Sequence, residues 1–293
     1  ASTTYGMTLD LSSCEKDDLM AVLFCEKPSV VIQVSNDGIA NRMLRELGIA
    51  FKMIGKPMAK RQIVIAHGEH KYVFEIDELR DTWFKSSYLL DRKQSGPRKA
   101  MERFMNYKKQ YLHYSFGRNF TGTAASLGID LHRRKPTGIN AAIIREKGCQ
   151  CDREMAYALY LAGFDVKDVT MTDLATGRED LTDVNMIAFV GGFSNSDVLG
   201  SAKGWAGAFL YNKKAKKALD DFYAREDTLS LGVCNGCQLM MELGLLYPDH
   251  EEHPVMMHND SHKFESGFLN VEIAQNESVM LKSLSGRRLG VWI

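Results

Sequence analysis

Excess charge of one sign, long apolar runs and abundant cysteine are all missing from this sequence. Lys and Arg together number 37, and Asp and Glu together also number 37, so the formal net charge is zero. A neutral chain has no broad field that attracts polyanions, so no nucleic-acid partner is expected. No apolar run approaches the ~20 residues that cross a bilayer, and the polar opening residues are unlike a secretion signal. We therefore expect no membrane association.

The cysteines are too sparse for a disulfide scaffold, since there are only six in 293 residues. Without a secretion signal, reduced thiols and a cytoplasmic protein are predicted. The composition is 45% hydrophobic and 25% charged, which is typical of a soluble globular protein. The length allows one large domain or two ordinary ones.

Two blocks separate near residue 135. The first block predicts an α+β layer, because strand-like and helix-like segments follow one another in the order β-α-β-β-α. The expected strands are Val30–Ser35, Ile49–Ile54, Gln62–Ile65 and Tyr72–Ile76; the expected helices are 40–47, capped by Asn36 or Asp37, and a long helix from Asp77. Leu79, Trp83 and Leu90 are spaced to form one apolar stripe on that long helix.

Residues 91–135 are rich in Lys, Arg and Tyr. Basic residues interleave with Tyr107, Tyr111 and Tyr114, a pattern that also occurs in single-strand nucleic-acid binding. Because the whole chain is neutral, a solvated helical and basic linker between domains is the favoured interpretation.

The second block alternates strands and helices, which predicts parallel βαβ units with both faces of the sheet covered. The expected strands are 140–144, 165–171, 185–190 and 228–233, with helices at 152–162, 215–223 and from Cys234 to about Gly244. A final strand is expected at 291–293.

The sequence Gly232-Val-Cys-Asn-Gly236 has a nucleophile between two glycines, at a predicted strand-to-helix junction. Such an elbow needs small neighbours because the turn is sharp. The helix N-terminus favours the thiolate form of Cys234. The backbone amide of Asn235 is a candidate oxyanion donor. A second donor is expected from Gly191-Gly192, which also follows a strand, because strand ends meet at one edge of a parallel sheet.

These residues resemble a known family. The segments Gly232–Gln238, Gly191–Ser194 and Asp197–Gly200 are similar to the glutaminase domain of phosphoribosylformylglycinamidine synthases. Val31–Val34 and Leu79–Trp83 resemble the end of the second synthetase-like half of the large single-chain form. The resemblance covers nearly the whole chain and implies a C-terminal fragment.

The resemblance implies a fold class and three segments. The fold is α/β, with a flavodoxin-like parallel sheet and a nucleophile elbow, preceded by part of an α+β domain of the AIR synthetase C-terminal type. Residues 1–90 would be the synthetase-like portion, 91–135 the linker, and 136–293 a class I glutamine amidotransferase domain that is incomplete at its C-terminus.

The resemblance also implies roles for single residues. Cys234 would attack the side-chain amide of glutamine and form a thioester. The oxyanion would be framed by Gly192, Phe193 and Asn235. Glutamine would be bound by Gln238, Ser194 and Asp197, although the chain reads Ser194-Asn-Ser-Asp197 where Ser-Tyr-Gly-Asp is usual.

A catalytic His and Glu follow the last strand in this family, and here the chain ends before that segment. Ala66-His-Gly-Glu69 imitates the missing segment but is expected to be a surface turn, and Asn259–Glu265 is expected to be structural. The parent reaction would use glutamine, ATP and Mg to convert formylglycinamide ribonucleotide to formylglycinamidine ribonucleotide in de novo purine biosynthesis. Its ATP and nucleotide sites would lie upstream of Ala1, so the fragment itself is expected to be inactive and to hold no cofactor.

Other interpretations remain open at this point. Cys234 and Cys237 could form a redox pair, or a zinc site with Cys149 and Cys151, although the one-residue spacing of the latter pair is poor for zinc and no metal is expected. A different cysteine hydrolase or stress protein of the same scaffold would need a His after the elbow. A non-catalytic binding module would keep the pocket without the chemistry.

Overall fold

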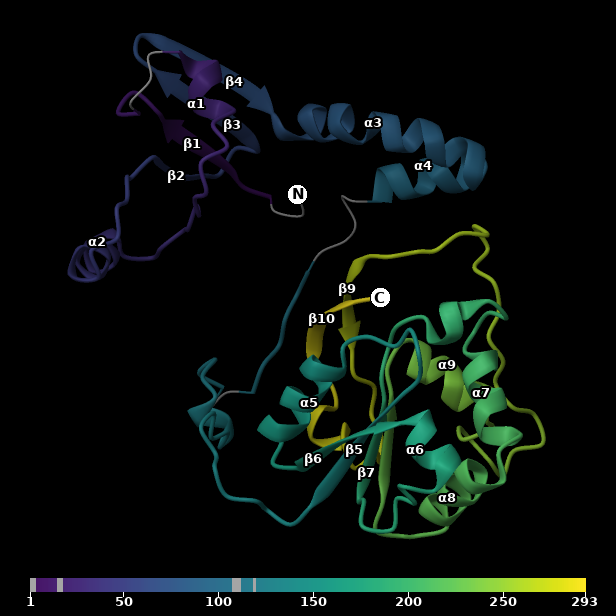
Figure 1. The fold of residues 1–293 in the computed structure, drawn as a ribbon. Helices are drawn as coiled ribbons and strands as arrows, with labels where there is room; N and C mark the ends of the chain where they lie inside the picture. The colour runs from purple at the N-terminus through teal and green to yellow at the C-terminus, as the bar shows by residue number, and fades with distance from the viewer. Residues whose placement is uncertain (1–3, 15–17, 107–111, 118–119) are drawn as a thin grey trace. The chain divides into compact units, whose positions relative to one another are not determined.

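The structure is a computed structural model that describes residues 4–14, 18–106, 112–117 and 120–293. Tyr107 and Tyr111 of the basic segment lie outside these residues. The chain forms two compact units, one of Ala1–Phe116 with Asn259–Ile293 and the other of Gly117–His258. The colours of Figure 1 follow the chain through both units. The predicted segment boundaries at residues 90 and 135 stay predictions.

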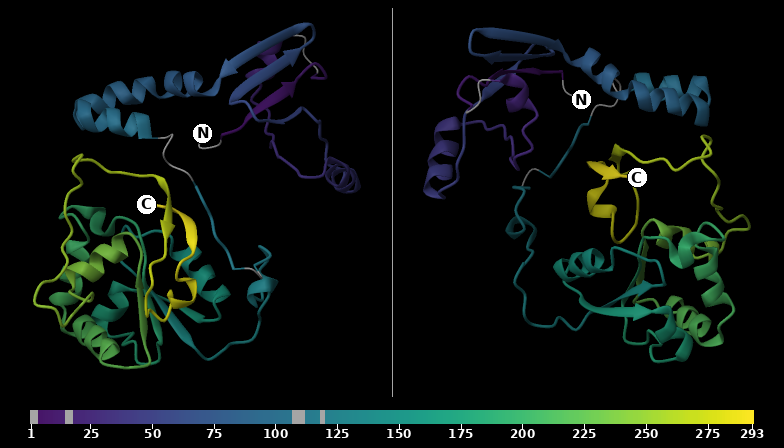
Figure 2. Two further views of the ribbon diagram at one scale, coloured as in Figure 1. Left: turned by 180° about the vertical axis from the view of Figure 1, so that it is seen from behind. Right: turned by 45° about the horizontal axis from the view of Figure 1, so that its top comes forward.

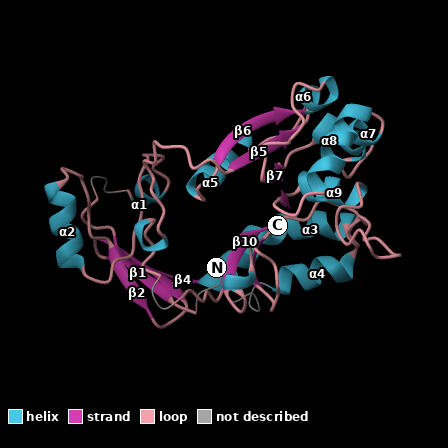
Figure 3. Ribbon diagram, turned by 90° about the horizontal axis from the view of Figure 1, so that it is seen from below, coloured by secondary structure: helices cyan, strands magenta, loops and turns pink. Residues whose placement is uncertain are grey.

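The first unit contains a mixed four-stranded sheet of order β2-β1-β3-β4. Strand β1 is parallel to β3, and the other two pairings are antiparallel. Three of these strands are labelled in Figure 3. The elements of this unit are β1 (Gly6–Asp10), α1 (Leu19–Leu23), α2 (Asp37–Glu46), β2 (Gly55–Met58), β3 (Gln62–His67), β4 (His70–Glu75), α3 (Ile76–Gln94), α4 (Pro97–Asn106), β9 (Phe268–Glu272) and β10 (Arg288–Trp292).

Several predicted elements of this unit are confirmed. Asn36 caps α2 by accepting a hydrogen bond from the N–H of Ile39, and the β3–β4 hairpin turns at Gly68, whose φ is 58°. The long helix is present as α3, but Leu79, Trp83 and Leu90 are all exposed on it. The strand expected at the C-terminus is part of β10, which pairs with β9 in a separate two-stranded sheet.

Two predicted strands are wrong. Val30–Ser35 and Ile49–Ile54 form no ladder with any described strand. Both segments are rich in residues that favour strands, but a strand also needs a partner, and tertiary context overrides propensity here. Instead β2 begins at Gly55, where a Cβ atom would lie 1.9 Å from the carbonyl oxygen of Thr8. That close approach to β1 requires glycine.

Asp91 near the end of α3 holds several segments of the first unit together. Its carboxylate accepts hydrogen bonds from Ser95 (2.8 Å), Arg103 of α4 (2.9 Å) and Lys263. Arg103 also pairs with Glu265. These contacts support the predicted structural role of the 259–265 segment.

The second unit is built on a fully parallel sheet of order β6-β5-β7-β8. This order matches the first four strands of a flavodoxin-like sheet, whose order is 2-1-3-4-5. The elements are β5 (Asn140–Arg145), α5 (Asp152–Leu161), β6 (Asp165–Thr170), α6 (Met171–Thr176), β7 (Met186–Phe189), α7 (Lys203–Leu210), α8 (Lys213–Tyr223), β8 (Leu229–Gly232) and α9 (Asn235–Glu242). The predicted α/β class is confirmed.

The sheet of the second unit is buried on both faces. Ala142 and Ile144 of β5 face a core shared with α6–α9, whereas Ala141 and Ile143 face a second core shared with α5. Figure 1 and the reverse view in Figure 2 show α5 on one side of the sheet and α7–α9 on the other. Side chains that alternate between two buried faces explain why the strands read as continuous apolar runs.

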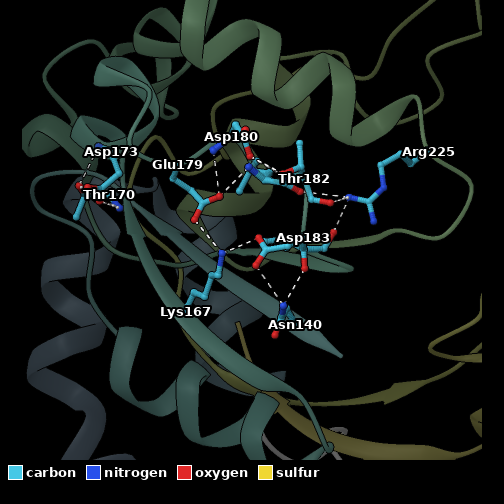
Figure 4. Close-up of polar contacts among 11 residues, drawn as sticks. Asn140, Lys167, Thr170, Asp173, Glu179, Asp180, Thr182, Asp183 and Arg225 are labelled. Atoms are coloured by element: carbon cyan, nitrogen blue, oxygen red, sulfur yellow. Dashed lines mark hydrogen bonds and ion pairs between the residues drawn. The ribbon is translucent and has the colours of Figure 1, made fainter. Parts of the chain in front are cut away.

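A polar network fastens the loop before β7 to the sheet (Figure 4). Lys167 of β6 donates to Asp183 at 2.6 Å and to Glu179 at 3.1 Å, and Asn140 donates to the Asp183 carbonyl at 2.9 Å. Burial lowers the pKa of Lys167, but its two carboxylate partners outweigh that effect and leave the pKa raised. Lys167 therefore stays charged, and we assign it a structural role.

Candidate active site

Cys234 lies at a strained turn between β8 and α9. Its φ and ψ are 54° and −110°, a conformation that a residue with a side chain rarely adopts. A Cβ atom at Gly236 would lie 2.1 Å from the carbonyl oxygen of Phe189, and one at Gly232 would lie 2.6 Å from that of Gly236. The turn therefore closes only because the residues two positions before and two positions after Cys234 are glycine. Cys234 itself is exposed to solvent.

The turn after β7 passes directly beside Cys234. A Cβ atom at Gly191 would lie 3.3 Å from the Cβ of Cys234 and 4.0 Å from its Sγ. Gly192 has a φ of 127°, which glycine tolerates best. The predicted approach of the two turns at one sheet edge is therefore present.

The candidate oxyanion donors differ in whether they are free. The N–H groups of Gly192 and Asn235 have no acceptor in the described part of the chain. The N–H of Phe193 instead donates to the carbonyl of Gly148 at 3.0 Å. In this conformation, two of the three predicted residues present an unpaired donor.

A third turn, which the sequence interpretation missed, supports the Gly191–Gly192 turn. It follows β5, where Gln150 donates to the carbonyl of Gly191 at 2.8 Å and Lys147 accepts from the N–H of Asn195 at 2.7 Å. Gly148 has a φ of 87°, and a Cβ atom there would lie 2.2 Å from the carbonyl oxygen of Phe193. A glycine just after a buried strand, like Gly191, was the available signal.

Two cysteines accompany this third turn. Burial raises the pKa of the Cys149 thiol, whose Sγ accepts a hydrogen bond from the N–H of Glu146 at 3.4 Å. Cys149 is therefore held as the neutral thiol, whereas Cys151 is exposed. In the described residues no group of three or more His, Cys, Asp or Glu side chains is arranged to hold a metal ion.

The three predicted glutamine-binding residues lie close to Cys234 in the chain or follow the turn after β7. Ser194 and Asp197 follow that turn, and Gln238 is on α9. Ser194 is 2% exposed, and its Oγ has no hydrogen-bond partner among the described residues. Asp197 accepts a hydrogen bond from the N–H of Ala202 at 3.3 Å, and Gln238 is half-buried on α9. Ser196 has a φ of 58°, so the usual glycine at this position has been replaced without loss of the left-handed turn.

No histidine is hydrogen-bonded or ion-paired to Cys234 within the described ranges. His250 lies beside Tyr247 in the polar segment after α9, with ring centroids 5.3 Å apart and the two rings tilted by 58°. His67 belongs to the β3–β4 hairpin of the first unit, where it pairs in register with His70. Among the described residues, the candidate site therefore offers an exposed thiol and two unpaired backbone N–H groups.

An open surface depression lies apart from this site, beside α5. It has a volume of about 690 Å³ and is lined by residues such as Arg153, Tyr157 and Tyr160, none of them on the three turns. Across the described residues, every helix is too short or too polar to span a membrane.

The parallel sheet and the strained elbow define an α/β protein with an exposed cysteine at a strand-to-helix turn. Residues 139–293, just over half of the chain, match the family model of the CobB/CobQ-like glutamine amidotransferase domain. The chain therefore belongs to the CobB/CobQ-like glutamine amidotransferase family. This membership argues against the alternative of a different cysteine hydrolase or stress protein of the same scaffold.

Named relatives extend the similarity over nearly the whole chain. It is 34% identical to phosphoribosylformylglycinamidine synthase of Dictyostelium discoideum, over 98% of this chain and 23% of that protein. It is 37% identical to the enzyme of the same name from Homo sapiens, over 94% of this chain and 22% of that protein. A probable Arabidopsis thaliana synthase, named chloroplastic/mitochondrial, is 36% identical over 98% of this chain and 21% of that protein.

The chain thus spans between a fifth and a quarter of the length of these curated relatives. Among solved structures, PurLQS from Thermotoga maritima is 23% identical with a TM-score of 0.43, over 54% of this chain and 67% of that chain. The family assignment rests on the sequence matches. The cytoplasmic location expected from the cysteines stays a prediction.

Proposed function

We propose that this chain carries the glutaminase half-site of a phosphoribosylformylglycinamidine synthase. The observation that carries the proposal is the backbone of Cys234, which is held at φ 54° and ψ −110° beside the Gly191–Gly192 turn. The family match and the named relatives support the same assignment.

The reaction at this site is acyl transfer to sulfur. The Sγ of Cys234 attacks the side-chain carbonyl carbon of glutamine, and the carbonyl oxygen gains negative charge. The free N–H groups of Gly192 and Asn235 are suited to stabilise that charge. The C–N bond then breaks, ammonia leaves, and water hydrolyses the thioester to glutamate. Gln238, Ser194 and Asp197 are proposed to bind the glutamine.

Proton transfer requires a general base, which takes the thiol proton and later activates water. We propose that this base lies in a part of the synthase outside this chain. The ATP, the Mg and the formylglycinamide ribonucleotide of the synthase reaction are likewise assigned to the rest of the parent protein.

Affinity labelling of Cys234 tests the proposal. A chloroketone that mimics glutamine should alkylate Cys234 at least about tenfold faster than Cys237, since binding raises the local concentration of the reactive group. Peptide mass spectrometry identifies the labelled thiol. Cys237, half-buried one turn along the same helix, is the matched internal control, and the Cys237→Ala variant should label normally. Equal labelling of the two cysteines would refute a glutamine site at the elbow.

An ammonia-release assay tests the missing base. The chain extended past Ile293, using the sequence of its own parent protein, should hydrolyse glutamine, and Cys234→Ala in that longer chain should abolish the activity. If the extended protein labels at Cys234 but releases no ammonia, the site binds glutamine without turning it over.

A further inference from the structure

The side chain of Asn235 connects the two turns of the site. It is 2% exposed, and its Oδ1 accepts a hydrogen bond from the N–H of Ser194 at 3.1 Å. Its Nδ2 donates to Oε1 of Gln238 at 2.8 Å. One buried carboxamide therefore links the turn after β7 to the first turn of α9, on either side of Cys234.

The direction of these hydrogen bonds is fixed by chemistry. A backbone N–H can only donate, so the group of Asn235 that faces Ser194 must be its oxygen. The other group is then the NH2, which can only donate, so Gln238 must turn its oxygen toward Asn235. The Nε2 of Gln238 is left over, with no acceptor in the described part of the chain.

We infer that the Asn235 side chain is a positioning residue that forces Gln238 to present N–H donors to the substrate. This inference rests on the proposed glutaminase function and deepens it. The substrate group that Gln238 recognises would be an oxygen acceptor, a carboxylate or a carbonyl, and not the ammonium group of glutamine. The side chain of Asn235 acts through Gln238 and through the turn that carries Ser194 and does not itself contact the substrate, whereas the backbone N–H of Asn235 is the separate oxyanion donor proposed above.

Removing the carboxamide would have two consequences. The Asn235→Ala variant leaves the buried N–H of Ser194 without an acceptor and frees the Gln238 amide to turn over. A misaligned Ser194 turn weakens recognition of glutamine, and so does a Gln238 amide that can adopt either orientation. Cys234 keeps its exposed position on the elbow. The loss should therefore appear in affinity for a glutamine mimic more than in the reactivity of the thiol.

Saturation kinetics of Cys234 alkylation separate these effects. The glutamine-mimicking chloroketone gives an inhibition constant and a maximal rate, and iodoacetamide reports the bare thiol. Asn235→Ala should raise the inhibition constant about tenfold, the scale of one or two lost hydrogen bonds, with less than about a twofold change toward iodoacetamide. Gln238→Glu keeps an acceptor for Asn235 but loses the donors, so it should weaken chloroketone binding by a similar factor.

Asn212→Ala is the matched control, because this asparagine caps α8 and is not on the three turns. It should lower the melting temperature and leave both alkylation rates unchanged. An unchanged inhibition constant in Asn235→Ala, or an equal slowing toward both reagents, would overturn the positioning role. Tight binding by Gln238→Glu would overturn the assigned polarity. If the chloroketone labels Cys234 of the wild-type chain no faster than Cys237, the proposed function itself fails, which is a distinct result.

Discussion

Residue 236 must be glycine for the elbow to form, because there is no room for a Cβ atom at this position. A Cβ atom there would lie 2.1 Å from a backbone oxygen of β7, which cannot move without disturbing the sheet. We predict that Gly236→Ala lowers the free energy of unfolding of the second unit by at least about 2 kcal/mol, as overpacking does. Denaturant titration followed by fluorescence of the buried Trp205 measures the change.

Gly207 is the control for this prediction, since it also lies within a helix of the second unit. A Cβ atom there meets only the ring of Tyr211, at 3.7 Å. Gly207→Ala should be neutral or stabilise by up to about 1 kcal/mol, because alanine loses less entropy in a helix. A change in Gly236→Ala as small as that in Gly207→Ala would mean that helix α9 can shift away from β7.

The main chain of the site was easier to predict than its side-chain contacts. Cys234, Gly191 and Gly192 could be placed because strand ends and glycine pairs are visible in a sequence. The hydrogen bonds of the Asn235 side chain to Ser194, 41 positions away, and to Gln238, three positions away, could not, because both depend on the orientation of a side chain. The hydrogen bond from the Phe193 N–H to the Gly148 carbonyl could not be predicted either, because it joins two turns that are far apart in the sequence.

At the scale of elements, Asp91 is the main ionic anchor between α3, α4 and the 259–265 segment. Burial raises the pKa of this carboxyl, but hydrogen bonds from Lys263 and Ser95 and the charge of Arg103 outweigh that effect and lower it below its usual value. A carboxyl with a lowered folded pKa stabilises the fold above its unfolded pKa of about 3.9 and loses that contribution as the pH falls through the folded pKa.

We therefore predict that Asp91→Asn destabilises the first unit at pH 7, by about 1–3 kcal/mol, since charge-assisted hydrogen bonds are lost. The difference from wild type should shrink as the pH falls below about 4, because the wild-type carboxyl then becomes neutral as well. Hydrogen exchange of the α3 and α4 amides measures this difference in stability between wild type and variant at each pH. A difference that is constant down to pH 3 would show that charge is not the cause.

Strands were predicted well where the strand they pair with is also apparent from the sequence. The β3–β4 hairpin and the strands of the parallel sheet could be recognised because their neighbours lie in the same stretch of chain or in regular alternation. Val30–Ser35 has the composition of a strand but no ladder in the described structure, and Val30 and Val31 are 86% and 78% exposed. Composition indicates where a strand can form, whereas pairing decides whether it does.

At the scale of the whole chain, the two units differ in how much apolar surface they bury. Among the described residues of the first unit only Leu11, Ile65 and Ala100 are buried hydrophobic residues. The second unit buries both faces of its sheet under α5–α9. Since burial of apolar surface is the main stabilising contribution in folding, the second unit should be much the more stable.

Hydrogen exchange on the intact chain tests this difference with matched elements. Helices α4 and α8 are of similar length, but α8 buries Ala215, Ala218, Leu219 and Phe222 whereas α4 buries only Ala100. Amides of α8 and of strands β5 and β7 should therefore exchange more slowly than those of α4, on the order of a hundredfold or more. Local opening of the first unit would then leave the Cys234 elbow folded, and Cys234 labelling should persist in mild denaturant after α4 has exchanged. Equal protection of α4 and α8 would instead mean that the two units unfold as one.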